Sequence, residues 1–206
     1  MLVDKPFSQA CENNRDPILD ILQRVFADRQ QVLEVGSGTG QHAVYFAPRL
    51  PHLTWQTADL EVNHDGINAW IDDFPSGNLR RPLFVNADQR PWTLNGYQPD
   101  ALYTANTCHI MAWSSVENFF AEMATQLSDH AVLAIYGPFN YGGRFTSDSN
   151  ARFDQWLKQQ ASHQGIRDFE AVNRLAEAAG FRLAEDNAMP ANNRLLVWKK
   201  FSTTWN

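Results

Sequence analysis

Glycine stands at every second position of a segment that directly follows a short apolar stretch, residues 32–35: Gly36, Gly38 and Gly40. Glycine lets the backbone turn sharply and approach a ligand closely, because it has no Cβ to clash. A loop between a strand and the start of a helix also presents free N–H groups, which can hold a polar ligand. The spacing therefore predicts a ligand-binding loop.

The residue that follows the loop decides between two nucleotide-binding patterns. The dinucleotide fingerprint G-x-G-x-x-G or G-x-G-x-x-A needs a small residue where this chain has Gln41. The pattern found is G-x-G-x-G, with Glu34 two places before the first glycine. It resembles the first motif of the class I S-adenosylmethionine-dependent methyltransferases. The resemblance implies that the loop, including Ser37 and Thr39, holds the methionine half of that cofactor. It also implies that Glu34 acts through water or fixes the loop.

Three polar residues follow later strands of the predicted sheet. Asp59 lies 19 positions beyond Gly40, at the end of the second strand. Ligands of open α/β sheets bind outside the carboxyl ends of the strands, where such a carboxylate can accept hydrogen bonds from both ribose hydroxyls of an adenosine. The methyltransferase resemblance implies that Asp88 lies near the adenine amino group and that Asn106 contacts the sulfonium end.

Residues at the exits of the fourth and fifth strands are candidates for the methyl-acceptor side. His109 is a candidate general base, since its unperturbed pKa is about 6.5, although a lone histidine is often a structural group. Tyr136 is the second catalytic candidate. Asn140, Asn192 and Asn193 are predicted to lie on loops facing the acceptor, and the last two are equally suited to a turn.

Arginine and aromatic side chains complete the candidate set. Arg15 either binds the methionine carboxylate, if residues 1–15 fold over the cofactor site, or forms a surface ion pair. Arg152 and Arg167 either bind an acidic substrate or are solvated charges at helix ends. The helical spacing of three aromatic residues favours core packing over an aromatic cage: Trp113, Phe153 and Trp156.

The elements that position these residues follow from periodicity, capping residues and turn residues. An irregular arm is predicted for residues 1–15. Helices are predicted at 16–27, 41–50, 63–74, 113–127, 150–161 and 169–179. Strands are predicted at 32–35, 53–58, 83–85, 100–106, 131–136, 181–185 and 195–199.

Alternation of strands and helices indicates an α/β fold with a mostly parallel sheet and helices on both faces. The closing strand pair predicts one antiparallel strand, at the sheet edge near the C-terminus. No repeat or composition break divides the chain, so residues 1–206 are predicted to form a single domain. This pattern is that of the Rossmann-like methyltransferase fold.

Composition narrows the classes of function. The formal charge of −6 over 206 residues argues against a broad nucleic-acid surface. Two distant cysteines and scattered histidines predict neither a disulfide framework nor a metal site. There is no apolar run of about 18 residues and no signal-peptide pattern, so we expect a cytoplasmic protein without a membrane span. The sequence predicts no oligomeric state.

Seven short stretches carry a narrower resemblance. They are NRDPIL at 14–19, LEVGSGTGQH at 33–42, NTCHI at 106–110, YGPF at 136–139, SNARFD at 149–154, GIRD at 165–168 and MPANN at 189–193. Together they resemble the family that includes vertebrate methyltransferase-like protein 26, which carries the domain of unknown function 938. The match spans nearly the whole chain. It implies a class I S-adenosylmethionine-binding fold and leaves the substrate open.

Three classes of function remain at this point. The favoured one is an S-adenosylmethionine-dependent methyltransferase that acts on a small molecule by in-line displacement, which requires no protein nucleophile or metal. The second is a cofactor-binding regulator that has lost catalysis. The third is an NAD-dependent oxidoreductase, which Gln41 and the closing strand pair disfavour.

Overall fold

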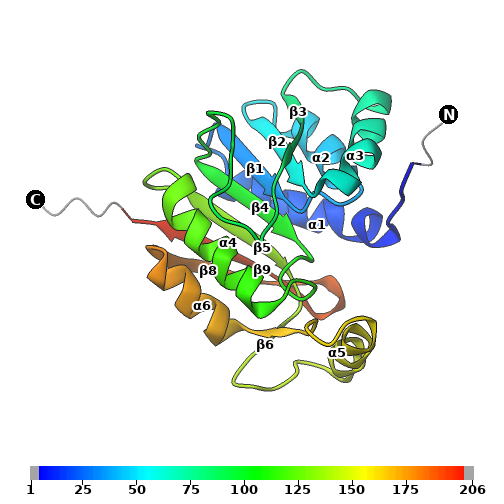
Figure 1. Ribbon diagram of the computed structural model, residues 1–206, viewed down its shortest axis with the longest axis vertical. Helices are drawn as coiled ribbons and strands as arrows, with labels where there is room; N and C mark the ends of the chain where they lie inside the picture. Colours follow the sequence, from blue (N-terminus) through cyan, green and yellow to red (C-terminus); the bar gives the residue numbers. More distant parts are fainter. Residues whose placement is uncertain (1–4, 202–206) are drawn as a thin grey trace, which may run out of the picture.

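One seven-stranded sheet runs through the centre of the computed structural model, which describes residues 5–201 (Figure 1). Its strand order is β3-β2-β1-β4-β5-β9-β8. The strands are β1 (Gln31–Val35), β2 (Thr54–Asp59), β3 (Leu79–Phe84), β4 (Ala101–Ala105), β5 (Val132–Gly137), β8 (Phe181–Met189) and β9 (Asn193–Lys200). Strands β1 to β5 pair in parallel, so their carboxyl ends meet at one edge. The predicted α/β architecture is confirmed.

Helices cover both faces of this sheet. They are α1 (Gln9–Val25), α2 (Gln41–Phe46), α3 (Glu61–Asp73), α4 (Trp113–Gln126), α5 (Asp148–Gln160) and α6 (Phe169–Ala178), with short 3-10 turns η1 (Ala47–Arg49) and η2 (Pro190–Asn192). Helices α1 to α3 lie on one face and α4 and α6 on the other. A parallel strand buried on both faces reads as continuous apolar sequence, and every residue of β5 is buried.

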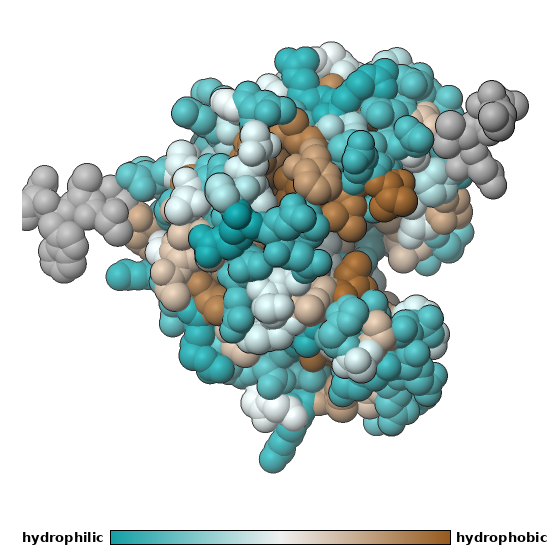
Figure 2. All heavy atoms as spheres, viewed as in Figure 1, coloured by the Kyte–Doolittle hydropathy of each residue, from teal (hydrophilic) through white to brown (hydrophobic). Residues whose placement is uncertain are grey.

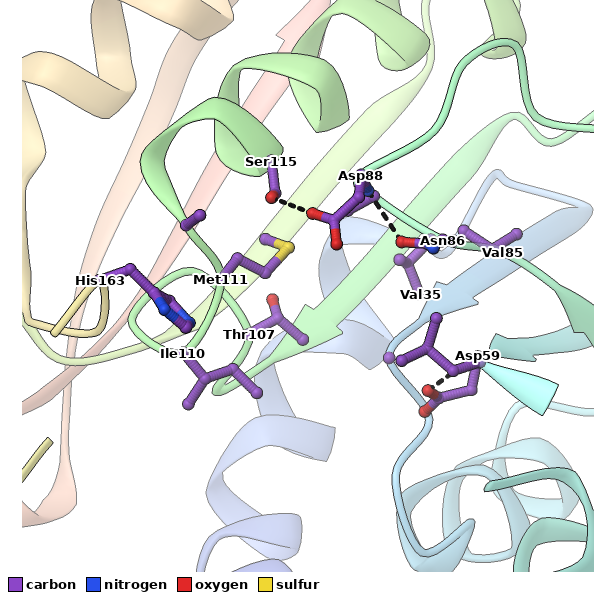
Figure 3. A pocket seen from close by; sticks show the side chains of 14 residues that line it. Val35, Asp59, Val85, Asn86, Asp88, Thr107, Ile110, Met111, Ser115 and His163 are labelled. Atoms are coloured by element: carbon purple, nitrogen blue, oxygen red, sulfur yellow. Dashed lines mark hydrogen bonds between the residues drawn. The ribbon is translucent and has the colours of Figure 1, made fainter. Parts of the chain in front are cut away.

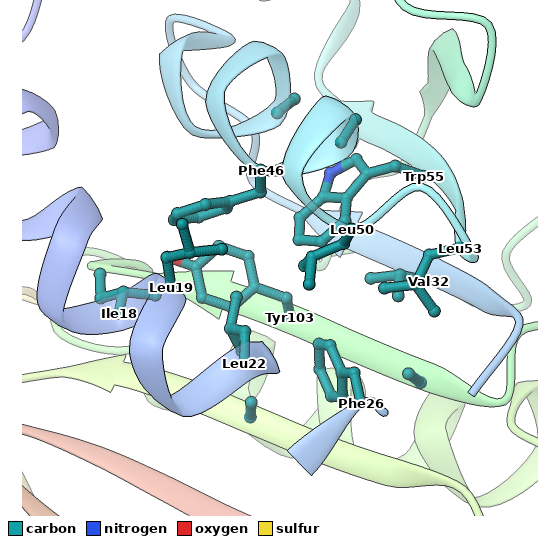
Figure 4. Packing of buried hydrophobic residues seen from close by; sticks show 14 of the residues in the cluster. Ile18, Leu19, Leu22, Phe26, Val32, Phe46, Leu50, Leu53, Trp55 and Tyr103 are labelled. Atoms are coloured by element: carbon teal, nitrogen blue, oxygen red, sulfur yellow. The ribbon is translucent and has the colours of Figure 1, made fainter. Parts of the chain in front are cut away.

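The core under α1 and α2 combines aliphatic side chains with several large aromatic ones (Figure 4). Phe46 packs edge-on to Tyr103, with ring centroids 5.6 Å apart, and Trp55 lies against both rings. Such pairs add about 0.5–1.5 kcal/mol each to the free energy gained by burial. This cluster lies beneath the loop after β1 and gives that loop a rigid base.

The antiparallel strand is not at the sheet edge, which corrects the prediction. Strand β9 pairs antiparallel with both β5 and β8, so β8 is the edge strand. The sequence shows two consecutive strands but not which of them inserts into the sheet. Leu195 to Trp198 in β9 are fully buried, as an interior strand requires.

Helix α1 begins seven residues before the predicted start, which corrects the boundary of the irregular arm. Asp16-Pro17 is a typical helix start, yet here Pro17 lies inside the helix and Ser8 is the N-cap, its Oγ accepting the Cys11 N–H at 3.3 Å. Only residues 5–8 of the described arm are irregular. Residues 1–4 of the predicted arm lie outside the described part.

Strand β3 also begins earlier than predicted, at Leu79 instead of residue 83. It is the other edge of the sheet, where proline and charged residues are tolerated, so Arg80, Arg81 and Pro82 hid it from a pattern search. A two-stranded parallel sheet of β6 (Phe139–Asn140) and β7 (Arg167–Asp168) was not predicted. Strand β6 precedes α5 in the chain and β7 follows it, so this small sheet joins the two ends of the segment that contains α5.

Candidate functional site

The loop between β1 and α2 follows a backbone path that suits glycine. Gly36, Gly38 and Gly40 have φ angles of 72°, 58° and 90°, in the left-handed region that strains other residues. A Cβ on Gly36 would also lie 2.5 Å from Thr107 Cγ2, which follows β4. The alternating glycines therefore let the loop turn and pass directly against the chain that leaves β4.

Glu34 lies beneath this loop and is almost fully buried. Its Oε2 accepts hydrogen bonds from Trp55 Nε1 at 3.0 Å and from Ser37 Oγ at 3.2 Å. Burial raises the pKa of Glu34 to about 7, while the Trp55 and Ser37 hydrogen bonds act against that rise. Of the two roles expected for Glu34, these contacts describe the one that fixes the loop.

A cavity of about 330 Å³, here called the acidic cavity, opens at the carboxyl ends of β1 to β4 (Figure 3). The carboxylates of Asp59 and Asp88 lie on two sides of it. Most of the remaining wall is apolar and includes Leu60, Val85 and Met111. A cavity that is apolar except for a few placed polar groups is typical of a small-molecule site.

Asp59 lies at the end of β2 and is held by three donors. Its Oδ2 accepts the Gly38 N–H at 2.7 Å, and its Oδ1 accepts the Leu60 N–H at 2.7 Å and Asn63 Nδ2 at 2.8 Å. A carboxylate has about four acceptor sites, so capacity remains for a ligand hydroxyl. The bond to Gly38 also links this carboxylate to the glycine loop.

Asp88 follows β3 and is the second carboxylate in the lining of the acidic cavity. Its Oδ1 accepts a short hydrogen bond from Ser115 Oγ, drawn in Figure 3, and its backbone N–H donates to Asn86 Oδ1 at 2.9 Å. Ser115 is in the first turn of α4 and is buried. No sequence signal singled out Ser115, because its partner is 27 residues away.

A second cavity of about 690 Å³, here called the asparagine cavity, adjoins the first and shares Ile110 with it. It is formed by the start of α1, the chain after β4 and β5, the start of α5 and the β8–β9 turn. In Figure 2 the molecule is hollowed between α5 and the rest of the chain. Five predicted residues line this cavity: Asn106, His109, Tyr136, Asn192 and Asn193.

His109 and Tyr136 are both buried in the wall of the asparagine cavity. Burial, with a smaller contribution from the Arg167 charge, lowers the pKa of His109 to about 4. Its imidazole is thus neutral at physiological pH and can accept a hydrogen bond, although it is a weak base. Burial raises the pKa of Tyr136, and hydrogen bonds with Asn14 and Asn193 oppose that rise.

Several candidate residues do not line either cavity: Glu34, Ser37, Gly38, Thr39 and Gly40 at the glycine loop, and Arg15 and Asn140 elsewhere. Arg15 forms an ion pair with Glu12 and lies 4.3 Å from the ring centroid of Tyr45, as the ion-pair alternative expected. Its role toward a cofactor stays a prediction. Asn140 is in β6, and its buried Oδ1 has no hydrogen-bond partner within the described residues.

Asn192 and Asn193 combine the two roles that the sequence left open. Asn192 adopts φ of 59° in the turn between β8 and β9, and its side chain donates to Ser149 Oγ at 3.1 Å. Asn193 donates to the Pro190 carbonyl at 3.2 Å. They are turn residues, and the turn they form is one wall of the asparagine cavity.

The prediction that Phe153 and Trp156 are core residues was wrong. Their rings are stacked with centroids 5.8 Å apart and planes within 13°, on the side of α5 that faces the asparagine cavity. Trp156 is 52% exposed. Helical spacing identifies a common face but not whether that face meets the core or a cavity. Trp113 is half-buried and packs against the core under α4, as predicted.

Sequence reasoning missed the group that attaches α1 to the site. Gln41 is buried and clamps the start of α1, a role that its place after the glycine loop does not indicate. Its Oε1 accepts the Ser8 N–H at 2.6 Å, and its Nε2 donates to Glu12 Oε1 at 2.8 Å. Thr39 Oγ1 also donates to Gln41 Oε1 at 3.1 Å. The clamp brings Ser8 into the wall of the asparagine cavity.

A buried chain of hydrogen bonds extends from this clamp. Asn14 Oδ1 and His42 Nε2 are 2.7 Å apart, and Tyr103 Oη lies 3.1 Å from His42 Nδ1. Burial lowers the pKa of His42 to about 4. This histidine is therefore neutral and structural. In the sequence it stood out only as the last residue of the 33–42 stretch that carries the family resemblance.

Across residues 5–201, no three His, Cys, Asp or Glu side chains gather as a metal ion would require. No helix in that range has the length and apolar character to cross a membrane.

Several solved structures with the same fold are named as methyltransferases or as O-methyltransferase family proteins. An O-methyltransferase family protein from Burkholderia thailandensis has a TM-score of 0.76 at 19% identity, covering 92% of this chain and 57% of that one. An O-methyltransferase family 2 protein from Planctomyces limnophilus, in complex with apigenin, has a TM-score of 0.78 at 13% identity, covering 93% and 58%. Human N-acetylserotonin methyltransferase, in complex with the cofactor, has a TM-score of 0.68 at 13% identity, covering 91% and 56%. This chain spans little more than half the length of these proteins, and at such identities the likeness shows the fold alone.

The class that the fold defines is thus the Rossmann-like methyltransferase fold, as predicted. The chain belongs to the family described as "Protein of unknown function (DUF938)", whose model matches residues 5–200. Its relationship to methyltransferase-like protein 26 stays a prediction.

Proposed function

We propose that this protein is an S-adenosylmethionine-dependent methyltransferase that acts on a small molecule. The observation that carries the proposal is the acidic cavity, whose lining brings together Gly36 of the glycine loop and the carboxylates of Asp59 and Asp88. The fold shared with methyltransferases supports it. A small-molecule acceptor is supported by the neighbouring asparagine cavity and by the apigenin bound to the Planctomyces protein.

The residues of the acidic cavity fit the chemistry of the cofactor. The Asp59 carboxylate retains acceptor capacity for the ribose hydroxyls, and the Asp88 carboxylate suits the adenine amino group. Leu60, Val85 and Met111 offer apolar surface to the adenine ring. Gly36 would carry the methionine half, since any Cβ at this position would collide with Thr107 and displace the loop.

When bound, S-adenosylmethionine would supply an electrophilic methyl group on its sulfonium, and the protein would contribute positioning and electrostatics. Asn106 would present its side-chain amide where the two cavities adjoin. His109, neutral at physiological pH, would accept a hydrogen bond from the acceptor. Tyr136, fixed between Asn14 and Asn193, would orient the acceptor through its phenol.

Calorimetric titration of the full chain with S-adenosylmethionine, S-adenosylhomocysteine and NAD tests the cofactor. We expect micromolar binding of the first two and none of NAD. Asp59→Ala should weaken S-adenosylhomocysteine binding at least tenfold, because a charged hydrogen-bond acceptor contributes about 1.5–3 kcal/mol. Asp72→Ala, an exposed carboxylate of α3 paired with Arg81, is the control. Equal affinity of wild type and Asp59→Ala would refute the assignment.

Binding alone does not separate an enzyme from a cofactor-binding regulator. Incubation with labelled S-adenosylmethionine and fractionated small-molecule extract makes that separation. We expect label in a small-molecule fraction, and less label with Tyr136→Phe. Tight cofactor binding with no transfer to any fraction would instead assign the protein to the regulator class.

A further inference from the structure

The asparagine cavity is uncharged. Among the described residues that line it, none is Asp, Glu, Lys or Arg. Its polar groups are mainly side-chain amides, from six asparagines: Asn13, Asn14, Asn106, Asn150, Asn192 and Asn193. Each amide offers both a donor and an acceptor without a formal charge. In a chain with a formal charge of −6, this composition distinguishes the cavity from the acidic cavity beside it.

Charged residues close to this cavity are used elsewhere. Arg167, a candidate for binding an acidic substrate, donates to the carbonyls of Cys108 at 3.0 Å and His163 at 2.8 Å, and to that of Met111. Asp154 follows Phe153 but pairs with Lys158 at 2.6 Å and accepts the Ile166 N–H at 2.8 Å. Neither Arg152 nor Arg167 lines the cavity. The cavity therefore offers no counter-charge to an ionic ligand.

His109 does not change this neutrality at physiological pH. It is the one histidine in the described lining, and burial lowers its pKa to about 4. Protonated His109 would be a cation beside the Arg167 guanidinium, and the repulsion between the two charges also lowers the pKa of His109. The cavity stays uncharged down to mildly acidic pH.

One wall of the cavity is flat and aromatic. Phe153 and Trp156 stack within 13° of parallel, and the Phe153 and His109 rings form a T-shaped pair with centroids 5.4 Å apart. Trp156 and Ile110, also in the lining, remain 52% and 45% exposed. Exposed apolar surface next to convergent polar groups is characteristic of a ligand site. A planar ligand face would cover this wall.

We propose that the methyl acceptor is an uncharged, planar small molecule. Its face rests on the Phe153–Trp156 wall, and its polar edge hydrogen-bonds the asparagine amides. An ionic acceptor would lose its hydration in this cavity without gaining a counter-charge, which is unfavourable. The volume of about 690 Å³ is within the range of small-molecule sites. This inference rests on the proposed methyltransferase function, whose acceptor class it specifies.

Three probes of one scaffold test the charge preference: 6-hydroxy-2-naphthamide, 6-hydroxy-2-naphthoate and 6-hydroxy-2-naphthylmethylamine, which at pH 7 are neutral, anionic and cationic. Dissociation constants are measured by ligand-observed NMR on the full chain without cofactor. We expect the amide to bind at least tenfold more tightly than either charged probe. A charged probe that binds as tightly as the amide, or binding of none of the three at millimolar concentration, overturns the proposal.

Variants locate the binding. Trp156→Ala should weaken amide binding about tenfold, whereas Trp70→Ala, which removes a ring stacked on Phe74 in another part of the molecule, should leave it unchanged. Asn13→Asp, a near-isosteric change at an exposed lining position of α1, should increase affinity for the cationic probe about fivefold and decrease it for the anionic one. If Asn13→Asp left the relative affinities for the cationic and anionic probes unchanged, the probes would bind outside the asparagine cavity.

The same measurements separate two kinds of failure. If S-adenosylhomocysteine does not bind but the neutral probe is preferred, the methyltransferase assignment fails and the ligand class stands. If S-adenosylhomocysteine binds but the probes show no charge preference, the function stands and the acceptor class is wrong.

Discussion

The acidic cavity and the asparagine cavity adjoin at one sheet edge and share Ile110, yet they are built differently. The acidic cavity carries two carboxylates, and its main groups follow three consecutive strands of one parallel sheet. The asparagine cavity is formed by five segments, from Ser8 to Asn193, and its lining carries no formal charge in the described residues. Under the proposed function, the acidic cavity would hold the cofactor and the asparagine cavity would hold the methyl acceptor.

This difference explains what could be predicted from the sequence. Gly36, Asp59 and Asp88 follow successive strands, and the carboxyl ends of parallel strands must meet, so pattern and topology together placed them. Asn13 and Asn150 come together with Asn193 only through the path of α1 and α5 and the β8–β9 turn. Nothing in local periodicity encodes that path.

The fold shows the same division. The order of the helices and of the seven strands of the main sheet was predicted, because it depends on local periodicity and capping, whereas the two-residue strands β6 and β7 were missed. The start of α1 was missed, because Asp16-Pro17 is the more typical start signal, whereas the observed start combines the Ser8 cap with hydrogen bonds to the distant Gln41. The position of β9 between β5 and β8 was also missed, because contacts between strands distant in the sequence decide which strand lies inside the sheet.

The carboxyl buried beneath the glycine loop and the asparagine cavity should respond differently to pH, and this is the largest effect we expect. Folding raises the pKa of Glu34 from 4.5 to about 7, so the folded state binds this proton more tightly than the unfolded state. The stabilisation is complete below pH 4.5 and is lost as pH rises to about 7. Wild type should therefore lose about 3 kcal/mol more than Glu34→Gln between pH 4.5 and 8.

Denaturant unfolding at several pH values measures this difference. Glu117→Gln, at an exposed position of α4, is the control and should follow wild type. Affinity for the neutral naphthamide should stay constant from pH 5.5 to 8, because His109 does not titrate there. If the free energy of unfolding changed with pH in the same way for wild type and Glu34→Gln, the Glu34 carboxyl would not be the cause of the pH dependence.

Gly36→Ala should disable the acidic cavity selectively. The new Cβ meets Thr107 at 2.5 Å and φ is 72°, so the loop must move. Backbone strain of about 2 kcal/mol predicts a loss of roughly 30-fold in S-adenosylhomocysteine affinity by calorimetry. Gly77→Ala, where no atom lies within 4 Å of the new Cβ, should behave as wild type. Comparable loss of naphthamide binding in Gly36→Ala would contradict the separation of the two cavities.

Gln41→Ala should affect both cavities, because Gln41 joins the glycine loop to α1. Its loss leaves the Ser8 N–H and the Glu12 carboxylate without this partner, which predicts a destabilisation of about 1.5 kcal/mol. Thermal unfolding and the two binding assays measure it, with Gln23→Ala at an exposed position of α1 as the control. An unchanged naphthamide affinity would mean that α1 keeps its place without the clamp.

Ser115→Ala should have the smallest effect and should be confined to the acidic cavity. It removes the hydrogen bond that orients Asp88, which predicts a threefold loss of S-adenosylhomocysteine affinity, about 0.7 kcal/mol. Ser114→Ala, at the exposed neighbouring position, is the matched control. A larger loss than that of Gly36→Ala would reverse the order of importance assigned to the two sides of the acidic cavity.

A crystal structure of the chain with S-adenosylhomocysteine tests the central claim most directly. The account predicts the ribose hydroxyls within hydrogen-bonding distance of Asp59, the adenine amino group near Asp88, and the sulfur facing the asparagine cavity. Electron density for the ligand outside the acidic cavity, or a sulfur that faces away from His109 and Tyr136, would contradict it.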